Sequence, residues 1–279
     1  MRADVLISQD LSCAGQVSMS CALPLFGAVN LKPTVLPTAV LSTHTGGFGN
    51  NTYLDLADEM IRILQHWQTL DLKFSAVYLG YLGANALDVL QTDLNLVTDA
   101  KTRLLVDPVM GDHGRLYRGF DMEYVAKMQA LLAKANIATP NLTEAKLLLG
   151  EPLTTSPRDA AELLALAAKI QDRFELETVV LTGVEIEPQK ISIACCDQNG
   201  RLWLDHKPKL AGTYFGTGDI FASVLFAALI LGHDLAFAEQ TAMDFVSTAI
   251  LKTKQPHDQR LGPDYGAAIP ALLQKLKLV

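Results

Sequence analysis

Short apolar runs separated by segments with helical spacing recur through the first two thirds of the chain. Three of these runs are Val5-Leu6-Ile7, Ser75 to Leu79 and Leu104-Leu105-Val106. They do not alternate polar and apolar residues, which is typical of parallel strands buried on both faces, with the intervening helices as crossovers. The sequence therefore predicts an α/β fold with three layers (α/β/α), in which helices cover both faces of a mostly parallel sheet.

The remaining predicted elements continue this order. Pro37 lies inside one predicted strand and favours an edge or irregular position, because proline cannot donate a ladder hydrogen bond. Gly27 follows the first predicted helix at a position typical of a helix C-cap. Further strands are predicted at 34–41, 137–139 and 178–181. Helices are predicted at 16–26, 54–70, 86–97, 120–135, 159–174, 235–252 and 267–276, and another begins near 140–144.

A hairpin follows the predicted parallel strands. Asn199-Gly200 is a strong turn signal, and it lies between the short strands 191–195 and 201–205. We therefore expect a late antiparallel hairpin beside the parallel sheet. Because no repeat, low-complexity tract or linker interrupts residues 1–279, we expect a single domain.

The hairpin leads into Gly216-Thr217-Gly218-Asp219, which is followed by the apolar run 220–231. That run predicts a buried helix, so the two glycines lie at its N-terminus. The first backbone N–H groups of a helix have no intrahelical partner and bind anions, above all phosphoryl groups. Glycine lets an anion approach the backbone without a Cβ in the way.

Asp219 needs a separate explanation, because a carboxylate beside an anion-binding helix start would repel a phosphate. One interpretation is that Asp219 accepts the proton of a hydroxyl that attacks the phosphoryl group. The alternative is a tight turn followed by a carboxylate that stabilises the helix dipole.

Several polar residues lie at or just beyond the predicted C-terminal ends of strands, where ligands bind in parallel α/β sheets. They are Asp10, Thr45, Tyr81 and Asp107. Thr45 belongs to a polar, glycine-rich loop, 42–51, which is either a mobile lid over a site or an ordinary surface loop.

Two carboxylates are candidate magnesium residues. Asp107 ends a strand and is followed by Pro108-Val109-Met110-Gly111-Asp112, so it either organises water around Mg²⁺ or terminates the strand. Glu144 lies in an early helical turn, where it either stabilises the dipole or holds a metal-bound water.

Composition excludes some classes of function. The net charge of −7 and the lack of a Lys/Arg cluster argue against a nucleic-acid surface. No apolar run reaches the roughly 18 residues of a membrane span, and the N-terminus lacks the apolar segment of a signal peptide. Four cysteines without metal spacing favour a reducing, cytoplasmic location. The G-x-G-x-x-G and G-K-[ST] patterns of Rossmann and P-loop nucleotide sites are also missing.

Taken together, these motifs resemble the ribokinase-like superfamily, in its pyridoxal kinase branch, over nearly the whole chain. Residues 216–219 resemble the anion hole and catalytic base of that superfamily, and 139–144 resemble its Asn-x-x-Glu motif. Residues 107–112 resemble a motif of pyridoxal and hydroxymethylpyrimidine kinases, while 44–46 and 79–83 are similar to substrate-side elements of pyridoxal kinases.

The resemblance implies transfer of a phosphoryl group from ATP to the 5′-hydroxyl of pyridoxal, pyridoxamine or pyridoxine. It implies Asp219 as the base, an anion hole of Gly216, Thr217 and Gly218 amides, and Mg²⁺ held largely through water. A monovalent cation such as K⁺ and a homodimer are also implied. The nucleotide and metal residues would be Asp107, Asn141, Glu144, Thr182, Gly183 and Phe215. The residues facing the ring would be Asp10, Thr45, Tyr81 and Asp219.

Two departures leave alternatives open. Asp10 stands where pyridoxal kinases typically have serine, and Gly111–Gly119 is short for a lid. Hydroxymethylpyrimidine (phosphate) kinase is therefore an alternative, although Tyr81 and the 44–46 loop favour pyridoxal kinase. No β-lid of the sugar-kinase type is predicted. A non-catalytic vitamin- or nucleotide-binding protein is a further alternative, against which Asp219 argues.

Overall fold

The computed structural model describes residues 2–154, 157 and 159–279. The strands of the main sheet are β1 (Arg2–Ser8), β3 (Pro33–Val35), β6 (Lys73–Leu79), β7 (Arg103–Val106), β10 (Ile137–Ala138), β11 (Thr178–Val184), β12 (Lys190–Cys196) and β13 (Leu202–Pro208). They lie in the order β13-β12-β11-β10-β7-β6-β1-β3. The β11–β12 and β12–β13 pairs are antiparallel and the other pairs are parallel. The predicted mostly parallel sheet with a late hairpin is confirmed.

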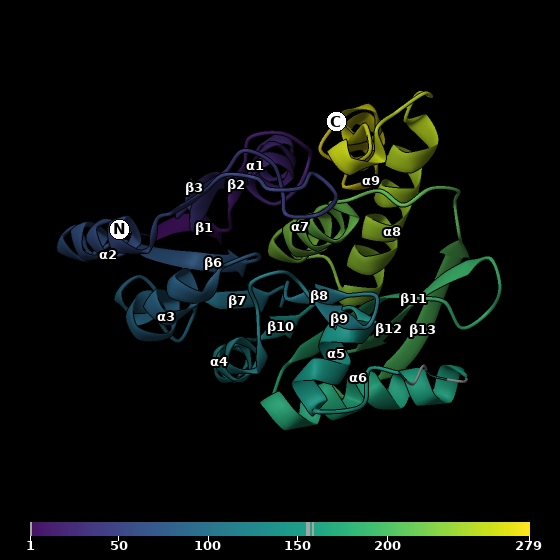
Figure 1. The fold of residues 1–279 in the computed structure, drawn as a ribbon, viewed down its shortest axis with the longest axis horizontal. Coiled ribbons are helices and arrows are strands. Elements are labelled where there is room, and N and C mark those ends of the chain that lie inside the picture. The colour runs from purple at the N-terminus through teal and green to yellow at the C-terminus, as the bar shows by residue number, and fades with distance from the viewer. Residues whose placement is uncertain (1, 155–156, 158) are drawn as a thin grey trace.

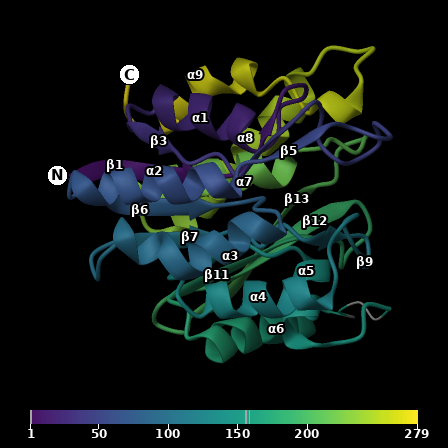
Figure 2. The ribbon, with the colours of Figure 1, turned by 60° about the vertical axis from the view of Figure 1, so that its left-hand side comes forward.

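Helices cover both faces of this sheet, as Figures 1 and 2 show. One face carries α1 (Met19–Ala28), α7 (Thr217–Ile230), α8 (Leu235–Lys252) and α9 (Ile269–Lys275). The other carries α2 (Ala57–Thr69), α3 (Ala84–Asp93), α4 (Met122–Leu132), α5 (Leu142–Leu149) and α6 (Ala160–Phe174). The predicted three-layer α/β/α arrangement is thus confirmed for the described residues.

The central strands contribute to a hydrophobic core on each face, because successive side chains of a strand point to opposite sides. In β1, Leu6 packs into the core on the α2–α6 side, whereas Val5 and Ile7 pack against α1 and α7–α9. All three side chains are fully buried. Burial on both faces explains why these strands show no polar–apolar alternation in the sequence.

The predicted strand 34–41 is wrong as one element. β3 ends at Val35 and Ala39–Leu41 forms β4 in a separate small sheet, with Pro37, which has no N–H to donate, between them. That sheet, with order β2-β4-β5, was not predicted; its other strands are β2 (Leu11–Ser12) and β5 (Tyr53–Asp55). A short hairpin of β8 (Gly111–Asp112) and β9 (Arg115–Leu116) was not predicted either.

The first helix begins later than predicted, and Gly27 lies inside it rather than at its C-cap, which is Val29. The cause is tertiary. Gln16 N–H donates to the Leu261 carbonyl at 2.8 Å, and Ser18 has a positive φ of 47°. A helix cannot include a residue held at that φ, so α1 begins at Met19.

The other helix boundaries lie within a few residues of prediction. Aspartates precede α4, α6 and α8, and each accepts a hydrogen bond from an early helical N–H. Short 3₁₀ turns occur at Leu94–Leu96, Gln259–Leu261 and Tyr265–Ala268. Among the described residues, no helix combines the length and the apolar character that crossing a bilayer requires.

Candidate active site

At the start of α7 the first backbone amides have no partner within the helix. Gly216 caps the helix with φ 77°, and a Cβ there would clash with the Gln16 carbonyl oxygen. The first helical hydrogen bond runs from Ile220 N–H to Gly216 O at 2.9 Å. The amides of Thr217 and Gly218 precede it, and a Cβ on Gly218 would have no atom within 4 Å. The backbone at Gly218 is therefore open to a ligand.

Asp219, in the first turn of α7, does not cap its own helix. Its Oδ2 accepts the Ser18 N–H at 2.9 Å, across 201 residues of sequence. Burial raises the pKa of Asp219 to about 7, opposed by that hydrogen bond and assisted by the nearby Asp10 charge. A carboxyl with this pKa can accept a proton at neutral pH.

Asp107 and Glu144 are both buried and lie near each other. Burial raises the pKa of Asp107 well above its usual range, and the Asp219 charge adds to this effect. Burial also raises the pKa of Glu144, with a further contribution from Asp107. Clustered buried carboxyls of this kind are stabilised by a cation, and hard oxygen donors suit Mg²⁺.

Asn141 and Glu144 form the capping box that begins α5. Glu144 Oε2 accepts the Asn141 N–H at 2.9 Å, and its Oε1 accepts the Met110 N–H at 3.1 Å. Asn141 Nδ2 donates to the Gly111 carbonyl at 2.8 Å. Both side chains therefore tie α5 to the segment after Asp107. A ligand contact by Glu144 would use the remaining lone pairs of its carboxylate.

Among the described residues, no group of three or more His, Cys, Asp or Glu side chains gathers around one point. Mg²⁺ that is bound with a nucleotide needs only one or two protein carboxylates, because phosphate oxygens and water complete its octahedron. The pair of Asp107 and Glu144 fits that kind of site.

Asp10 lies just beyond β1 and is 3% exposed. Its Oδ2 accepts the Ser12 hydroxyl at 2.8 Å. Burial raises its pKa, while hydrogen bonds from Ser18 and Ser12 oppose the shift. Tyr81 lies beyond the neighbouring strand β6, with its ring centroid 5.5 Å from that of Phe120. Asp10 and Tyr81 thus bring a hydrogen-bond-accepting carboxylate and an aromatic ring to the same edge of the sheet.

Phe215 connects the glycine segment to loop 42–52, which contains Thr45. The Phe215 ring centroid lies 4.6 Å from that of His44, and a Cβ on Gly46 would clash with the Phe215 ring. Two segments that were predicted separately, on the nucleotide and the ring side, are therefore in direct contact.

Thr182 and Gly183 lie within β11, where the pairing with β12 is irregular, rather than beyond a strand end as predicted. Thr182 N–H donates to Pro140 O at 2.9 Å, which places it beside Asn141. Gly183 is exposed, with φ 72° and open space at its Cβ position. A cavity of about 580 Å³ opens nearby; it is lined by Glu185, Gln189, Lys209, Leu210, Ala211, Gly212, Thr213 and Gln259.

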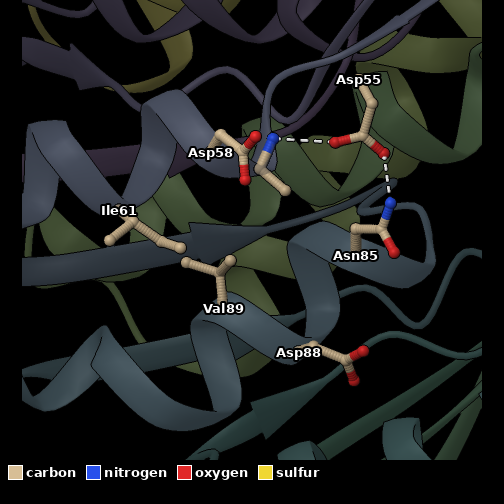
Figure 3. Close-up of a pocket in the computed structure, with 7 residues that line it drawn as sticks. Asp55, Asp58, Ile61, Asn85, Asp88 and Val89 are labelled. Carbon is tan, nitrogen blue, oxygen red and sulfur yellow. Dashed lines mark hydrogen bonds between the residues drawn. The ribbon is translucent and has the colours of Figure 1, made fainter.

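Another cavity, of about 400 Å³, lies between β5, α2 and α3. Figure 3 shows Asp55, Asp58 and Asp88 around it, with Asp55 hydrogen-bonded to Asn85. Its carboxylates would repel a phosphate, and its lining residues come from other elements than the α7 start. We do not assign it to the candidate active site.

Some residues of the site could not be found from the sequence. Ser18 falls inside the segment 16–26 that was predicted as helix, and Ser12 lies just before it among small residues, Cys13, Ala14 and Gly15. Gln259 and Arg260 lie in a polar segment near the C-terminus, yet Gln259 Oε1 accepts the Thr213 N–H at 2.8 Å. The turn-rich composition of 253–266 was the only signal there.

Comparisons with known proteins find a matching family model and similar solved structures. The family model described as phosphomethylpyrimidine kinase matches residues 22–264. A solved structure from Bacteroides thetaiotaomicron, named as a candidate phosphomethylpyrimidine kinase and crystallised with pyridoxal, is 34% identical; the match covers 97% of this chain and 95% of that chain, with a TM-score of 0.91. Pyridoxal kinase from Lactobacillus plantarum is also 34% identical, with 98% and 97% covered and a TM-score of 0.85.

A curated relative, the pyridoxine/pyridoxal/pyridoxamine kinase of Bordetella bronchiseptica, is 28% identical over 267 residues, which are 90% of each chain. By contrast, the chain spans only 56% to 64% of the length of the relatives from Schizosaccharomyces pombe, Saccharomyces cerevisiae and Caenorhabditis elegans.

Proposed function

Because the chain belongs to the phosphomethylpyrimidine kinase family, within the ribokinase-like superfamily, we propose that it phosphorylates the 5′-hydroxyl of pyridoxal, pyridoxamine or pyridoxine with ATP. The observation that carries this proposal is Asp219, a partly buried carboxyl with a pKa of about 7 in the first turn of α7. The relatives named as kinases of pyridoxal or related vitamers support it.

In the proposed reaction the 5′-hydroxyl donates its proton to Asp219 as its oxygen attacks the γ-phosphorus of ATP, and the bond from that phosphorus to the bridging oxygen breaks, so that ADP leaves. The amides of Gly216, Thr217 and Gly218 stabilise the charge that develops on the phosphoryl oxygens. The Ser18 N–H holds one carboxylate oxygen of Asp219, which leaves the other for the hydroxyl. Catalysis then depends on positioning and electrostatics, since phosphoryl transfer needs little covalent chemistry from the protein.

We assign the nucleotide to the cavity beside residues 209–213. It adjoins the end of β11, near Thr182 and Gly183, and its lining includes Thr213, which shortly precedes Gly216 in the chain. Phe215 and Asn141 would flank the phosphates. Two solved structures of similar fold contain ADP or an ATP analogue. They are under 25% identical to this chain and support the fold alone.

Asp107 and Glu144 are the proposed magnesium residues, acting largely through water. When bound there, Mg²⁺ would neutralise negative charge on the transferring phosphoryl group. The observation that favours a cation there is the burial of both carboxyls, which raises the pKa of each, and the further contribution of the Asp107 charge to the pKa of Glu144. A monovalent cation such as K⁺ is a further part of this proposal.

The acceptor ring is assigned to the edge formed by Asp10, Thr45 and Tyr81. Asp10 also supports a second candidate, phosphorylation of hydroxymethylpyrimidine or its phosphate. A carboxylate accepts hydrogen bonds from ring N–H or amino groups, and the family description names that substrate class.

The proposal extends to the molecule as a whole. Strands from both halves of the chain share the main sheet, which supports a single kinase domain over 1–279. The described cysteines are free thiols, and Cys21, Cys195 and Cys196 are buried, which suits a reducing cytoplasm. A homodimer is proposed from the family resemblance, and light scattering after size-exclusion chromatography tests it.

The decisive test is ADP release with Mg·ATP in parallel reactions on pyridoxal, pyridoxamine, pyridoxine and hydroxymethylpyrimidine. Turnover of a pyridoxine-type vitamer is expected. Turnover of the pyrimidine alone would favour the second candidate. ATP binding without turnover of any acceptor would favour a non-catalytic binding protein, and thermal stabilisation by ATP measures that binding independently.

A further inference from the structure

Residues 257–262, called the clasp segment here, contact three parts of the site that are distant in sequence. These parts are the turn before α1, loop 42–52 and the segment before Gly216. The hydrogen bonds run from Gln16 N–H to Leu261 O (2.8 Å), from His44 Nε2 to Arg260 O (2.7 Å) and from Phe215 N–H to Gln259 O (3.2 Å).

His44 is the contact of loop 42–52 with this segment. Gly46 N–H donates to His44 Nδ1 at 3.1 Å, so Nε2 carries the proton that the Arg260 carbonyl accepts. The His44 ring lies against Phe215 and, edge-on, against Phe48, with centroids 4.6 and 4.9 Å away. Both ring nitrogens of His44 are thus hydrogen-bonded, and its ring packs against Phe215 and Phe48.

Arg260 holds the tip of the same loop through its side chain. Its guanidinium forms a bidentate pair with Asp258, at 2.9 Å from Nε to Oδ1 and 2.7 Å from Nη2 to Oδ2. The remaining Nη1 donates to the Gly47 carbonyl at 3.0 Å. The guanidinium carbon lies 4.7 Å from the Phe48 ring centroid. Asp258 therefore orients the guanidinium, and Arg260 fixes Gly47 and Phe48.

The other side of the clasp segment fixes the residues before α7. Gln259 accepts Thr213 N–H with its side chain and Phe215 N–H with its carbonyl. Gly262 closes the segment: a Cβ there would lie 3.1 Å from both the Gln16 and Phe215 carbonyl oxygens. One short segment thus sets the distance between loop 42–52 and the anion-binding amides.

We propose that Arg260 is a positioning residue that holds loop 42–52 against the α7 start. The loop then places the hydroxyl of the acceptor substrate beside Asp219 and the phosphoryl group. This inference rests on the proposed function, in which Thr45 contacts the acceptor. Arg260 itself touches neither substrate. Losing it should impair use of the acceptor more than use of ATP, because neither Arg260 nor loop 42–52 lines the nucleotide cavity, which the clasp segment reaches through Gln259.

The test compares the full-length wild type with Arg260→Ala, Arg260→Lys and a control, Arg62→Ala. Arg62 is likewise an exposed arginine paired with a nearby carboxylate, Glu59, but it lies on α2. For Arg260→Ala we expect KM for the acceptor to rise about 10- to 100-fold, the effect of a misplaced reactant, with KM for ATP within about twofold. Amide exchange in peptides covering 42–52 should accelerate, while the rest of the chain exchanges as in the wild type.

Arg260→Lys should recover only part of the effect, because lysine lacks the fork that engages Asp258 and Gly47 together. Arg62→Ala should match the wild type in every measurement. Equal rises in both KM values, unchanged exchange in 42–52, or full recovery by lysine would each overturn the positioning role. If the wild type turns over no acceptor, the proposed function fails instead, and the exchange comparison alone decides whether Arg260 holds the loop.

Discussion

Two opposing effects determine the pKa of Asp219. Burial and the Asp10 charge disfavour its ionised form, whereas the Ser18 N–H stabilises that form. Ser18 presents this N–H from a left-handed backbone conformation, with φ 47°, which costs free energy in a residue other than glycine. Strain at a residue whose amide contacts the proposed base agrees with a functional role for this contact.

Replacing Asp219 by asparagine keeps the shape of the side chain but removes the proton acceptor. We expect kcat to fall roughly 10²–10⁴-fold, the usual contribution of a positioned base. ATP affinity, measured by calorimetric titration, should stay within a few fold of the wild type. Asp58→Asn, at the cavity of Figure 3, is the matched control and should retain full turnover. Near-normal kcat in Asp219→Asn would refute the assigned role.

The pH dependence of turnover follows from the same carboxyl. The base works only when ionised, so kcat/KM should rise with pH and level off above the Asp219 pKa of about 7. This rise should vanish from the residual activity of Asp219→Asn. A profile that is flat between pH 5.5 and 8.5, measured with buffers of constant ionic strength, would contradict the assignment.

At the scale of elements, the two glycines at the start of α7 lack a side chain for different reasons. Gly216 is needed by the protein itself, because its φ is 77° and a side chain would clash with Gln16. Gly218 has ordinary helical surroundings and open space before it. Its missing side chain therefore matters to a ligand rather than to the fold.

Gly218→Val and Gly216→Ala should consequently separate binding from folding. Gly218→Val should fold normally but bind Mg·ATP at least about tenfold more weakly, since a side chain would occupy the phosphate position. Gly216→Ala should lower the free energy of unfolding by roughly 1–3 kcal/mol, the cost of such backbone strain. Denaturant unfolding and ATP titration distinguish the two effects. The reverse pattern, with Gly218→Val unfolded and tight ATP binding retained, would contradict this division.

At the scale of the molecule, the sheet gathers carboxyls whose pKa values burial raises. Asp10 and Asp107 follow the strands β1 and β7, and Glu144 and Asp219 lie in the first turns of α5 and α7; pairwise charge effects connect the four. Glu239 lies apart on α8, where burial and the adjacent Asp205 raise its pKa to about 9. Such groups keep their protons in the folded state at a pH where the unfolded chain has lost them.

The thermal stability of the ligand-free protein should therefore fall as pH rises from 5 to 8. In that range the folded state binds more protons than the unfolded state, so the free energy of unfolding decreases with pH. Carboxyls with lowered pKa, such as Asp258 at about 2, change stability only below about pH 4.

Melting temperatures at pH 5, 6, 7 and 8 test this expectation, with roughly 2–4 °C for each kcal/mol lost. Asp219→Asn and Glu239→Gln should each flatten the curve, and Mg²⁺ should restore stability mainly at pH 8. A melting temperature that rises steadily over this range would refute the prediction.

Much of the fold and part of the site could be predicted from local pattern. The three-layer architecture, the hairpin at Asn199-Gly200 and the helix after Gly218 depend on neighbouring residues in the chain. The same holds for polar residues at strand ends, because parallel strands bring their C-terminal ends to one edge. Asp107 was accordingly predicted at that edge, whereas Asp219 was predicted at the start of the helix; the charge of Asp219 contributes to the raised pKa of Asp107.

Other features depended on contacts that local pattern does not encode. Tertiary contacts determine the start of α1, the small β2-β4-β5 sheet and the environment of Asp219. Examples of such long-range contacts are the hydrogen bonds of Ser18 with Asp219 and of Arg260 with Gly47, which join residues 201 and 213 positions apart. Periodicity and turn chemistry reflect interactions within a few residues, so they determined the layers and the position of the helix start that we propose as an anion site. Which amide holds the proposed base, and which arginine holds the loop beside it, was decided only when the folded backbone brought distant segments within hydrogen-bond distance.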